Sequence, residues 1–439
     1  MLAGSAIRRV AIVGGQRIPF ARAHGAYAAV GNQDMLSAVL RTLVAKFNLA
    51  GVRLGDVIAG ATIKHSRDFN LVRECVLSSG LDPHTPGLDI QRACGTSLEA
   101  AILIGGKIAL GQIDAGIAGG VDSVSDVPIV YPRSFQQKLL RSYRGRGFGA
   151  RVAPFFGLRP RDFKPVMPAV VEPRTGLSMG EHCEQMAKTW SISREAQDQL
   201  ALASHMKAAA AWQAGFYGDL VVDHEGLATD NNVRADTSLE KLAKLQPSFD
   251  RSAAGTLTAG NSTPLTDGAS AVLLASEEWA TARGLPVLAW LTYGKAWAVD
   301  YVSGHEGLLM APAYAVPAML KDAGLTLQDF DFYEIHEAFE AQVLCTLAAW
   351  ESADFCRERL GLERPLGSID RAKLNLKGGS VAIGHPFAAT GTRIVATLAK
   401  MLAESPRARR GLISVCTAGG MGVAAILESA RAAEMSKAA

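Results

Sequence analysis

The segment Gln91–Ser97 reads QRACGTS, and an apolar run with helical spacing follows it. The apolar positions of this run are Leu98, Ala101, Ile102, Ile104 and Ile108. Small residues around a cysteine, followed by such a run, predict that Cys94 lies at the first turn of a buried helix. The unpaired N–H groups and the positive dipole end of that helix favour a thiolate. We therefore expect the pKa of Cys94 to fall from about 8.5 toward roughly 3.5–7.5, which suits a nucleophile.

Two segments near the C-terminus share the glycine-rich character of the Cys94 segment. His385 lies within GHP at residues 384–386, and Cys416 begins the run CTAGGMG at residues 416–422. A lone cysteine or histidine is more often a core residue than a reactive one. Packing alone does not explain three reactive side chains at three strand-to-helix turns. The sequence thus predicts a site with one nucleophile, one base and one acid.

Composition places the chain among ordinary globular proteins. Its 439 residues are 49% hydrophobic and include 44 glycines, which allows two or three well-packed domains. A formal net charge of +3 gives no overall field for nucleic acid, so any basic surface must be local. Six dispersed cysteines without a C-x-x-C pair are typical of reduced thiols in a chain of this length.

The N-terminal sequence does not read as a targeting segment. Residues 8–15, RRVAIVGG, indicate a first core strand rather than a signal peptide or an amphipathic transit helix. No apolar run approaches the ~18 residues of a transmembrane helix, and the final SKAA is not a peroxisomal signal. We expect a cytoplasmic protein.

Two halves of the chain repeat one plan of strands and helices. In the first half we expect strands at 10–14, 56–63, 89–93, 115–119 and 269–276, and helices at 33–46 and 70–80. In the second half we expect strands at 287–294, 331–334, 411–416 and 423–428, and helices at 311–323 and 338–350. Cys94 and His385 then occupy equivalent helix starts, as a duplicated βαβ unit with a shared site would place them. Two mixed sheets covered by helices follow.

A long insertion interrupts the first half. Between Asp126 and about Thr256 the repeat gives way to a segment rich in Pro, Arg and Phe, and then to helical patterns at 180–190 and 194–214. An insertion of this length is expected to form its own lobe over the site. We therefore expect an N-terminal half at 1–126 completed by 257–285, a loop domain at 127–256 and a C-terminal half at 286–439.

Five segments, in this order along the chain, resemble the motifs of the thiolases, which cleave or form 3-ketoacyl-CoA with a reactive thiol. They are Cys94–Ser97, Gly260–Ala269, His336–Phe339, Gly378–Pro386 and Cys416–Gly420. The resemblance runs from about residue 7 to the C-terminal region. It implies an α/β fold of duplicated βαβαβαββ halves in an α-β-α-β-α layering, with an inserted loop domain that carries much of the CoA contact.

The resemblance also implies a role for each reactive residue. Cys94 would attack the ketone carbon, His385 would accept the proton of Cys94 or of CoA, and Cys416 would protonate the departing enolate. The backbone N–H groups of Cys94 and of Ala418 or Gly419 would form one oxyanion site.

His336 departs from the commonest thiolase pattern, which has Asn here to hold a water in the second oxyanion site. The sequence HEAF at 336–339 resembles the thiolase subunit of the fatty-acid oxidation trifunctional complexes, as do residues 175–181, 184–189 and 385–393. An imidazole can also donate to an oxyanion or hold a water. We expect His336 to be catalytic, with its protonation state open.

Substrate contacts implied by the resemblance lie elsewhere in the chain. Gly260, Asn261 and Thr263 would border the pantetheine of CoA. Met179 and Met310 either line the acyl pocket or fill the core. CoA and acetyl-CoA are substrates, and the resemblance implies no metal and no prosthetic group.

The insertion also contains a strongly basic stretch between Tyr131 and Pro165. It holds seven Arg and two Lys against one acid, Asp162, with Phe and Leu residues between them. This composition is typical of an amphipathic surface element. Its target would be the CoA nucleotide, an anionic membrane or an acidic partner subunit, and the alternative is a solvated loop with a few apolar anchors.

The resemblance implies 3-ketoacyl-CoA thiolase activity in fatty-acid β-oxidation, through an acyl-Cys94 intermediate and reversible by Claisen condensation. A decarboxylating condensing enzyme of the ketoacyl synthase type is one alternative, but that class usually lacks a second cysteine acting as acid. A non-catalytic CoA-binding subunit is another, and the three reactive residues count against it. We expect a homodimer or a dimer of dimers, with a hydratase-dehydrogenase subunit as a candidate partner.

Overall fold

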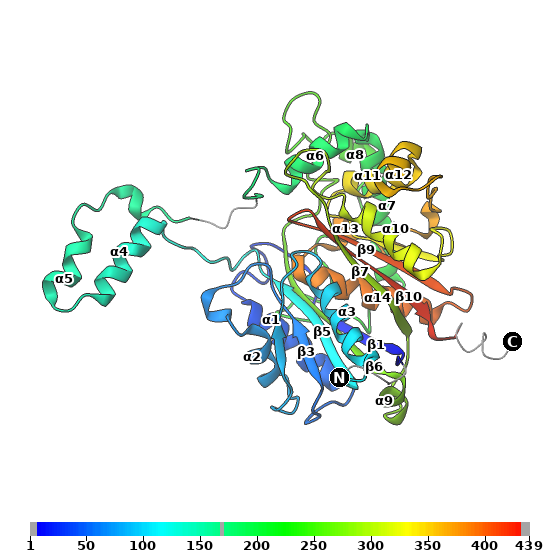
Figure 1. The fold of residues 1–439 in the computed structure, drawn as a ribbon, viewed down its shortest axis with the longest axis horizontal. Helices are drawn as coiled ribbons and strands as arrows, with labels where there is room; N and C mark the ends of the chain where they lie inside the picture. The colour runs from blue at the N-terminus through cyan, green and yellow to red at the C-terminus, as the bar shows by residue number, and fades with distance from the viewer. Residues whose placement is uncertain (1–6, 167–170, 432–439) are drawn as a thin grey trace.

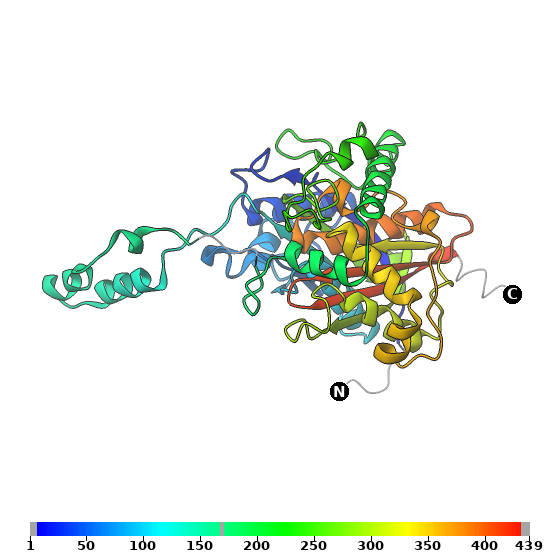
Figure 2. The same cartoon turned by 90° about the horizontal axis from the view of Figure 1, so that it is seen from above.

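The computed structural model describes residues 7–166 and 171–431. A layered body is built around a central sheet, and an arm that carries α4 (Arg133–Arg144) and α5 (Phe148–Val152) reaches away from it (Figure 1). The view from above shows the same arm standing clear of the body (Figure 2). Within the described ranges, no helix combines the length and the apolar character needed to cross a bilayer.

A single ten-stranded sheet runs through the body. The first half contributes, in spatial order, β4 (Gly87–Asp89), β3 (Asp56–Ala59), β5 (Ala115–Asp122), β6 (Thr266–Ser276) and β1 (Val10–Arg17). The second half continues the sheet with β7 (Ala289–Ala298), β10 (Met421–Ser429), β9 (Arg410–Thr417) and β8 (Phe332–Ile335). The short β2 (Ala21–Arg22) pairs with β6 outside this path.

The structure differs from the expectation of two separate sheets at the seam between the halves. There β1 and β7 pair antiparallel through Ala11 with Trp290 and Ile12 with Ala289. The seam is short, since β1 forms two residue pairs with β7 and seven with β6 on its other edge. Buried edge groups must find partners, so the two innermost strands hydrogen-bond to each other where they meet. Hydrophobic periodicity alone does not show which strand edges meet.

Helices cover both faces of each half and give the five layers expected for this fold class. α1 (Asn32–Lys46) and α2 (Leu71–Leu77) pack on the outer face of the first half. α10 (Ala311–Ala323) and α11 (Glu340–Glu351) share a core with the outer face of the second half. α3 (Thr96–Ala109) and α14 (Thr390–Glu404) form the middle layer between the two halves (Figure 1). The layered α/β architecture is therefore confirmed.

The two central helices cross at Gly391. A Cβ atom at this position would lie 2.3 Å from the backbone nitrogen of Leu98, so no larger residue fits. Gly391 is the second residue of α14, and Leu98 is the third residue of α3. The crossing thus presses the N-terminal ends of the two helices together. These are the ends next to His385 and Cys94.

The insertion between β5 and β6 continues beyond the arm into three helices that pack on the body. They are α6 (Met179–Thr189), α7 (Arg194–Gln213) and α8 (Leu239–Ala243). Ser178 caps α6 by accepting from the N–H of Glu181, and Ser193 caps α7 in the same way. The helices expected at 180–190 and 194–214 are confirmed. Two further short helices, α9 (Glu277–Ala282) and α12 (Ala353–Leu360), lie at the surface.

The turns that carry the reactive residues differ in detail from the expected strand-to-helix pattern. β4 ends at Asp89 and α3 begins at Thr96, so Cys94 lies in a turn before the helix. The preceding Ala93 has a φ of 44°, a left-handed conformation that is uncommon for a residue with a side chain. On the other side, the segment before His385 forms the helical turn α13 (Ser380–Ile383) rather than a strand.

Candidate active site

Three reactive side chains from distant parts of the chain meet at one place. Sγ of Cys94 and one ring nitrogen each of His336 and His385 all lie within 4.8 Å of one another. Cys94 precedes α3, His336 follows β8 and His385 precedes α14. Both imidazoles are almost fully buried, whereas Cys94 is partly exposed. The structure thus brings the expected nucleophile and both expected histidines together.

The two imidazole rings lie against each other with their centroids 4.1 Å apart. Nδ1 of His336 forms a hydrogen bond with Ser380 Oγ at 2.9 Å, and Nδ1 of His385 forms one with Thr390 Oγ1 at 2.5 Å. Nε2 of each ring is buried and has no hydrogen-bond partner among the described residues. Each ring is therefore held through Nδ1. Its Nε2 is left for proton transfer or for donation to a ligand.

Both histidines are neutral at working pH. Burial lowers the pKa of His385 to about 3, and the positive charge of Arg393 acts in the same direction. Burial lowers the pKa of His336 well below its ordinary value, with smaller contributions from His385 and Arg393. A neutral ring can accept a proton at a bare nitrogen or donate one from a protonated nitrogen. His385 is thus available as a base from the start of the reaction.

The expected lowering of the Cys94 pKa is wrong. Burial raises the pKa of Cys94 to about 12, although hydrogen bonds from the backbone N–H groups of Ala418 and Cys94 itself act the other way. The sulfur lies before the helix cap, Gly95, and not inside the first turn, so the helix end does not outweigh the loss of hydration. Cys94 is therefore a thiol at rest. The thiolate forms when the thiol gives its proton to a neighbouring base.

Cys416 lies on β9 and also keeps its proton. Burial raises the pKa of Cys416 well above its ordinary value, and the neighbouring sulfur of Cys94 raises it further. A thiol of this kind gives up its proton only to a strong base. An enolate is such a base, which fits the role of acid expected for Cys416.

The two candidate oxyanion donors after Cys416 differ in their environment. The N–H of Ala418 is directed at the Cys94 sulfur, where it stabilises a negative charge. The N–H of Gly419 donates to Oε1 of Glu172 at 2.8 Å, so it is already occupied. Oε2 of Glu172 accepts in turn from the hydroxyl of Tyr301 at 3.0 Å. Of the two alternatives, the geometry favours Ala418 as the backbone donor beside Cys94.

In the segment expected to border pantetheine, Gly260 lies at a pocket and Asn261 is buried inside the protein. Gly260 lines a narrow pocket together with Ser262, Arg22 and Arg234. Asn261 is fully buried, and its amide is used by Asp198, by the carbonyl of Thr256 and by the N–H of Thr258. The amide of Asn261 therefore has a structural role and offers no group to a ligand.

Thr263 is tied to the residues that surround His336. Its hydroxyl donates to the carbonyl of Ser380 at 3.0 Å, and its N–H donates to the carbonyl of Ala338. The side chain is partly buried. Thr263 therefore lies between the segment that carries His336 and the helical turn that contains Ser380.

Several residues of the site carry no sequence signal that would identify them. Arg22 and Arg234 are isolated cations in the sequence and meet only in the fold. Asp122, at the end of β5, accepts hydrogen bonds from the N–H groups of Ile63 and Ala388 and thereby connects the first half to the His385 segment. Burial raises the pKa of Asp122 to about 6. The only sequence signal for Asp122 is that a carboxylate stands at the end of a strand.

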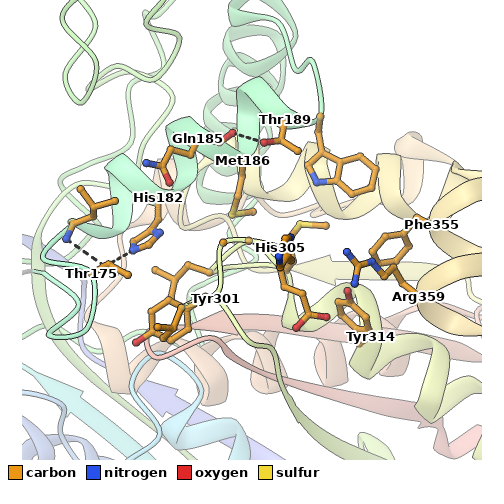
Figure 3. A pocket seen from close by; sticks show the side chains of 18 residues that line it. Thr175, His182, Gln185, Met186, Thr189, Tyr301, His305, Tyr314, Phe355 and Arg359 are labelled. Carbon is orange, nitrogen blue, oxygen red and sulfur yellow. Dashed lines mark hydrogen bonds between the residues drawn. The ribbon is translucent and has the colours of Figure 1, made fainter.

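A cavity of about 320 Å³ lies between the insertion and the second half (Figure 3). Its larger apolar and aromatic residues come from α6, the loop at 301–308, α10 and α12, and they are Met186, Tyr301, Met310, Tyr314 and Phe355. Polar side chains, among them His182, Glu306 and Arg359, line it as well. Met310 is thus at the wall, whereas Met179 is not among the described lining residues and packs beside them. Cys416 belongs to the same hydrophobic cluster as Met186 and Met310. The cavity and Cys416 therefore share one hydrophobic cluster, although Cys416 is not among the described residues that line the cavity.

Two family models match the chain. The model "Thiolase, N-terminal domain" matches residues 10–278, and "Thiolase, C-terminal domain" matches residues 289–429. A 3-ketoacyl-CoA thiolase of Yersinia pestis is 42% identical over 426 residues, which cover 96% of this chain and 97% of that protein.

Solved structures with the same fold were also found. The Bacillus anthracis acetyl-CoA acetyltransferase has a TM-score of 0.80 and 29% identity, and the match covers 97% of this chain and 100% of that chain. Human mitochondrial 3-ketoacyl-CoA thiolase in complex with CoA has a TM-score of 0.79 and 27% identity at the same coverage. The similarity therefore extends over both halves and the site between them.

Proposed function

Because the chain belongs to the thiolase family, we propose that it cleaves 3-ketoacyl-CoA with CoA to give acetyl-CoA and a shortened acyl-CoA. It is an acyltransferase of fatty-acid metabolism, and CoA takes part as a substrate. The observation that carries the proposal is the meeting of Cys94, His336 and His385 within 4.8 Å, with both imidazoles buried. A thiol beside a neutral imidazole is the arrangement that acyl transfer through a thioester requires.

In the first half-reaction, Nε2 of His385 takes the thiol proton of Cys94, and the sulfur attacks the ketone carbon of the substrate. The resulting oxyanion accepts from the backbone N–H groups of Cys94 and Ala418. The bond between the ketone carbon and the α-carbon then breaks. The acyl group stays on Cys94, and the electron pair leaves with the enolate of acetyl-CoA.

The enolate is protonated and the acyl group is then transferred to CoA. Cys416 gives its proton to the enolate carbon, while His336 stabilises the thioester oxygen of the enolate. Before the second half-reaction, the proton that His385 took from Cys94 passes to the Cys416 thiolate, so both groups return to their starting states. The thiol of CoA then attacks the acyl-Cys94 carbonyl and gives its proton to His385. Collapse of the tetrahedral intermediate releases acyl-CoA and the Cys94 thiolate, and protonated His385 returns its proton to Cys94.

The two pockets match the two ends of an acyl-CoA. The narrow pocket with Gly260 presents Arg22 and Arg234, whose charges suit the phosphates of CoA. The cavity of Figure 3 has an apolar part formed by Met186, Met310 and Phe355, which suits the acyl chain, and polar side chains line the rest of it.

The function is tested by thiolysis of purified 3-ketoacyl-CoA substrates from short to long chain, with acetyl-CoA release as the measurement. We expect CoA-dependent release of acetyl-CoA and a shortened acyl-CoA. Adding a candidate hydratase-dehydrogenase subunit shows whether a partner extends the range of chain lengths. A protein that binds CoA but releases no acetyl-CoA from any substrate would be a non-catalytic subunit, contrary to the proposal.

We also propose a homo-oligomer in a reducing compartment such as the cytoplasm. All six cysteines are unpaired, and five of them are buried. Free thiols of this number persist where the surroundings keep them reduced.

The arm has the surface of an element that docks on something anionic. Tyr143 and Phe148 are each 86% exposed and Phe156 is 78% exposed, among the arginines of α4 and α5. Figures 1 and 2 show that the body does not cover this surface. We propose that the arm binds an anionic membrane or an acidic partner subunit and takes no part in the chemical step.

Replacing Arg141, Arg144 and Arg146 with Ser should weaken co-sedimentation with anionic vesicles or co-purification of a partner. Thiolysis of a short 3-ketoacyl-CoA should stay near the wild-type rate. Binding by the wild type should fall steeply with salt, because exposed charges are screened within ~8 Å at physiological ionic strength.

A matched control removes three exposed positive charges from the body, at Lys321, Arg371 and Arg407. This control should bind as the wild type does, since the proposal assigns binding to the arm and not to net charge. If the arm variant instead raised the Michaelis constant for CoA and left association unchanged, the basic stretch would be a CoA nucleotide site.

A further inference from the structure

A buried chain of hydrogen-bonded polar groups ends at Nδ1 of His336. Nη2 of Arg393 donates to Oγ of Ser380 at 2.8 Å, and Oγ of Ser380 is 2.9 Å from Nδ1 of His336. All three residues are at most 2% exposed. Arg393 comes from α14, Ser380 from α13 and His336 from the end of β8. Three separate elements therefore meet at one ring nitrogen.

The direction of these hydrogen bonds follows from the chemistry of the donors. A guanidinium group can only donate, so the Ser380 oxygen accepts from Arg393. The Ser380 hydroxyl has one proton, and Nδ1 of His336 is the only acceptor for it within the described residues. A neutral imidazole that accepts at Nδ1 carries its own proton on Nε2. Nε2 of His336 is the buried, unpartnered atom at the site.

His385 needs the opposite arrangement to act as the base. Its Nε2 must be bare to take the Cys94 proton, so its Nδ1 must carry the proton and donate to Thr390 Oγ1. The two rings lie 4.1 Å apart, yet they have different partners at Nδ1. Ser380 as the partner of His336 and Thr390 as the partner of His385 therefore give the two rings different roles, a donor and a base.

The charge of Arg393 supports the same assignment. Arg393 is buried, and its Nε and Nη1 have no hydrogen-bond partner in the described structure. Its positive charge disfavours a second positive charge on either ring, which contributes to the low pKa of His336 and of His385. Burial raises the pKa of the nearby Glu334 to about 8, so this carboxyl does not fully offset the charge of Arg393 at neutral pH.

We propose that Arg393 and Ser380 are positioning residues that hold His336 as the neutral tautomer with its proton on Nε2. His336 is then a fixed donor to the oxygen of the enolate and does not compete with His385 for the proton of Cys94. This inference rests on the proposed thiolase function and deepens it, because it assigns the protonation state of the second histidine. The common solution at this position, an amide, needs no such control, since its N–H₂ group always donates.

The first test is structural and does not depend on turnover. Neutron diffraction of the deuterium-exchanged protein should show deuterium on Nε2 of His336 and on Nδ1 of His385. Deuterium on Nδ1 of His336 would overturn the proposal even in a fully active enzyme. Loss of thiolase activity in the assay above, with the expected deuterium positions, would instead count against the function and not against the tautomer.

The second test uses kinetics in two backgrounds. Ser380→Ala should lower kcat about 10- to 100-fold with little change in KM, because part of the His336 population then carries the wrong proton and loses its donor role. Ser380→Thr keeps the hydroxyl and should recover most of the rate. In His336→Asn protein, Ser380→Ala should lower kcat no further, since an amide needs no hydrogen bond from Ser380 to act as a donor.

If Ser380→Ala lowers kcat equally in both backgrounds, Ser380 only supports the structure and its proposed positioning role is wrong. An unchanged kcat for Ser380→Ala in the wild-type background would also overturn the proposal, because turnover would then not depend on the Ser380 hydroxyl. Thermal unfolding of each variant separates these outcomes from a folding defect. If Ser380→Ala does not fold, the wild-type neutron structure still decides between the two tautomers.

Discussion

Replacing Cys94 with Ala should reduce thiolysis by about 10⁴-fold or more, because the variant has no atom that can carry the acyl group between the two half-reactions. Incubation of the wild type with an acyl-CoA donor, followed by peptide mass spectrometry, should show an acyl increment on the peptide that contains Cys94. The variant should show neither label nor turnover. Cys75→Ala is the matched control, since Cys75 is buried on α2 in the outer layer of the first half and should leave both unchanged.

The same cysteine has a characteristic pH dependence at rest. With the pKa of Cys94 raised to about 12, the thiolate fraction rises about tenfold for each pH unit below that value. Alkylation of the resting enzyme by iodoacetamide should therefore accelerate steadily between pH 7 and pH 9. A plateau in the alkylation rate below pH 8 would mean a preformed thiolate. In the acyl-transfer experiment, an acyl label that persists on another cysteine of Cys94→Ala would reject Cys94 as the nucleophile.

Replacing Cys416 with Ser should separate the two catalytic cysteines. The variant should still accept an acyl group on Cys94 from a simple thioester, because that step needs only Cys94 and His385. Exchange of the α-protons of acetyl-CoA should slow by about 10²- to 10⁴-fold, the usual contribution of a positioned acid or base. Proton NMR in deuterated buffer measures this exchange directly.

The control for Cys416→Ser is Cys345→Ala, which changes another buried thiol in the same hydrophobic cluster. This control should keep the wild-type exchange rate. Unchanged exchange in Cys416→Ser would remove Cys416 from the mechanism. Slower exchange in both variants would point to a packing effect shared by the cluster and not to loss of the acid.

The candidate reactive residues could be proposed from the sequence because their signals are local, and the structure brings Cys94 and His385 together. Cys94, His385 and Cys416 each stand in a glycine-rich turn next to an element with clear periodicity, and the helix expected at 311–323 has the same bounds in the structure. Apolar spacing predicts the central helix that follows Cys94. The layered architecture followed from the alternation of these elements and from the resemblance of their motifs.

Long-range effects could not be predicted in this way. The pKa of Cys94 depends on how deeply the surrounding residues bury the sulfur, and this outweighs the nearby helix end. Arg393 lies inside the protein, although arginine is mostly exposed, so nothing in its sequence context indicates contact with Ser380. The pairing of β1 with β7 is likewise a property of two edges that are distant in sequence.

The crossing at Gly391 has a consequence for how the enzyme passes through its cycle. Cys94 and His385 belong to different halves, and the halves are locked where the backbone of α3 meets α14 without space for a side chain. A hinge motion that opened the halves would separate this buried contact and the sheet seam together. We therefore expect Cys94 and His385 to keep their relative positions through the cycle, so that the two half-reactions differ in the bound ligand and not in the arrangement of the halves.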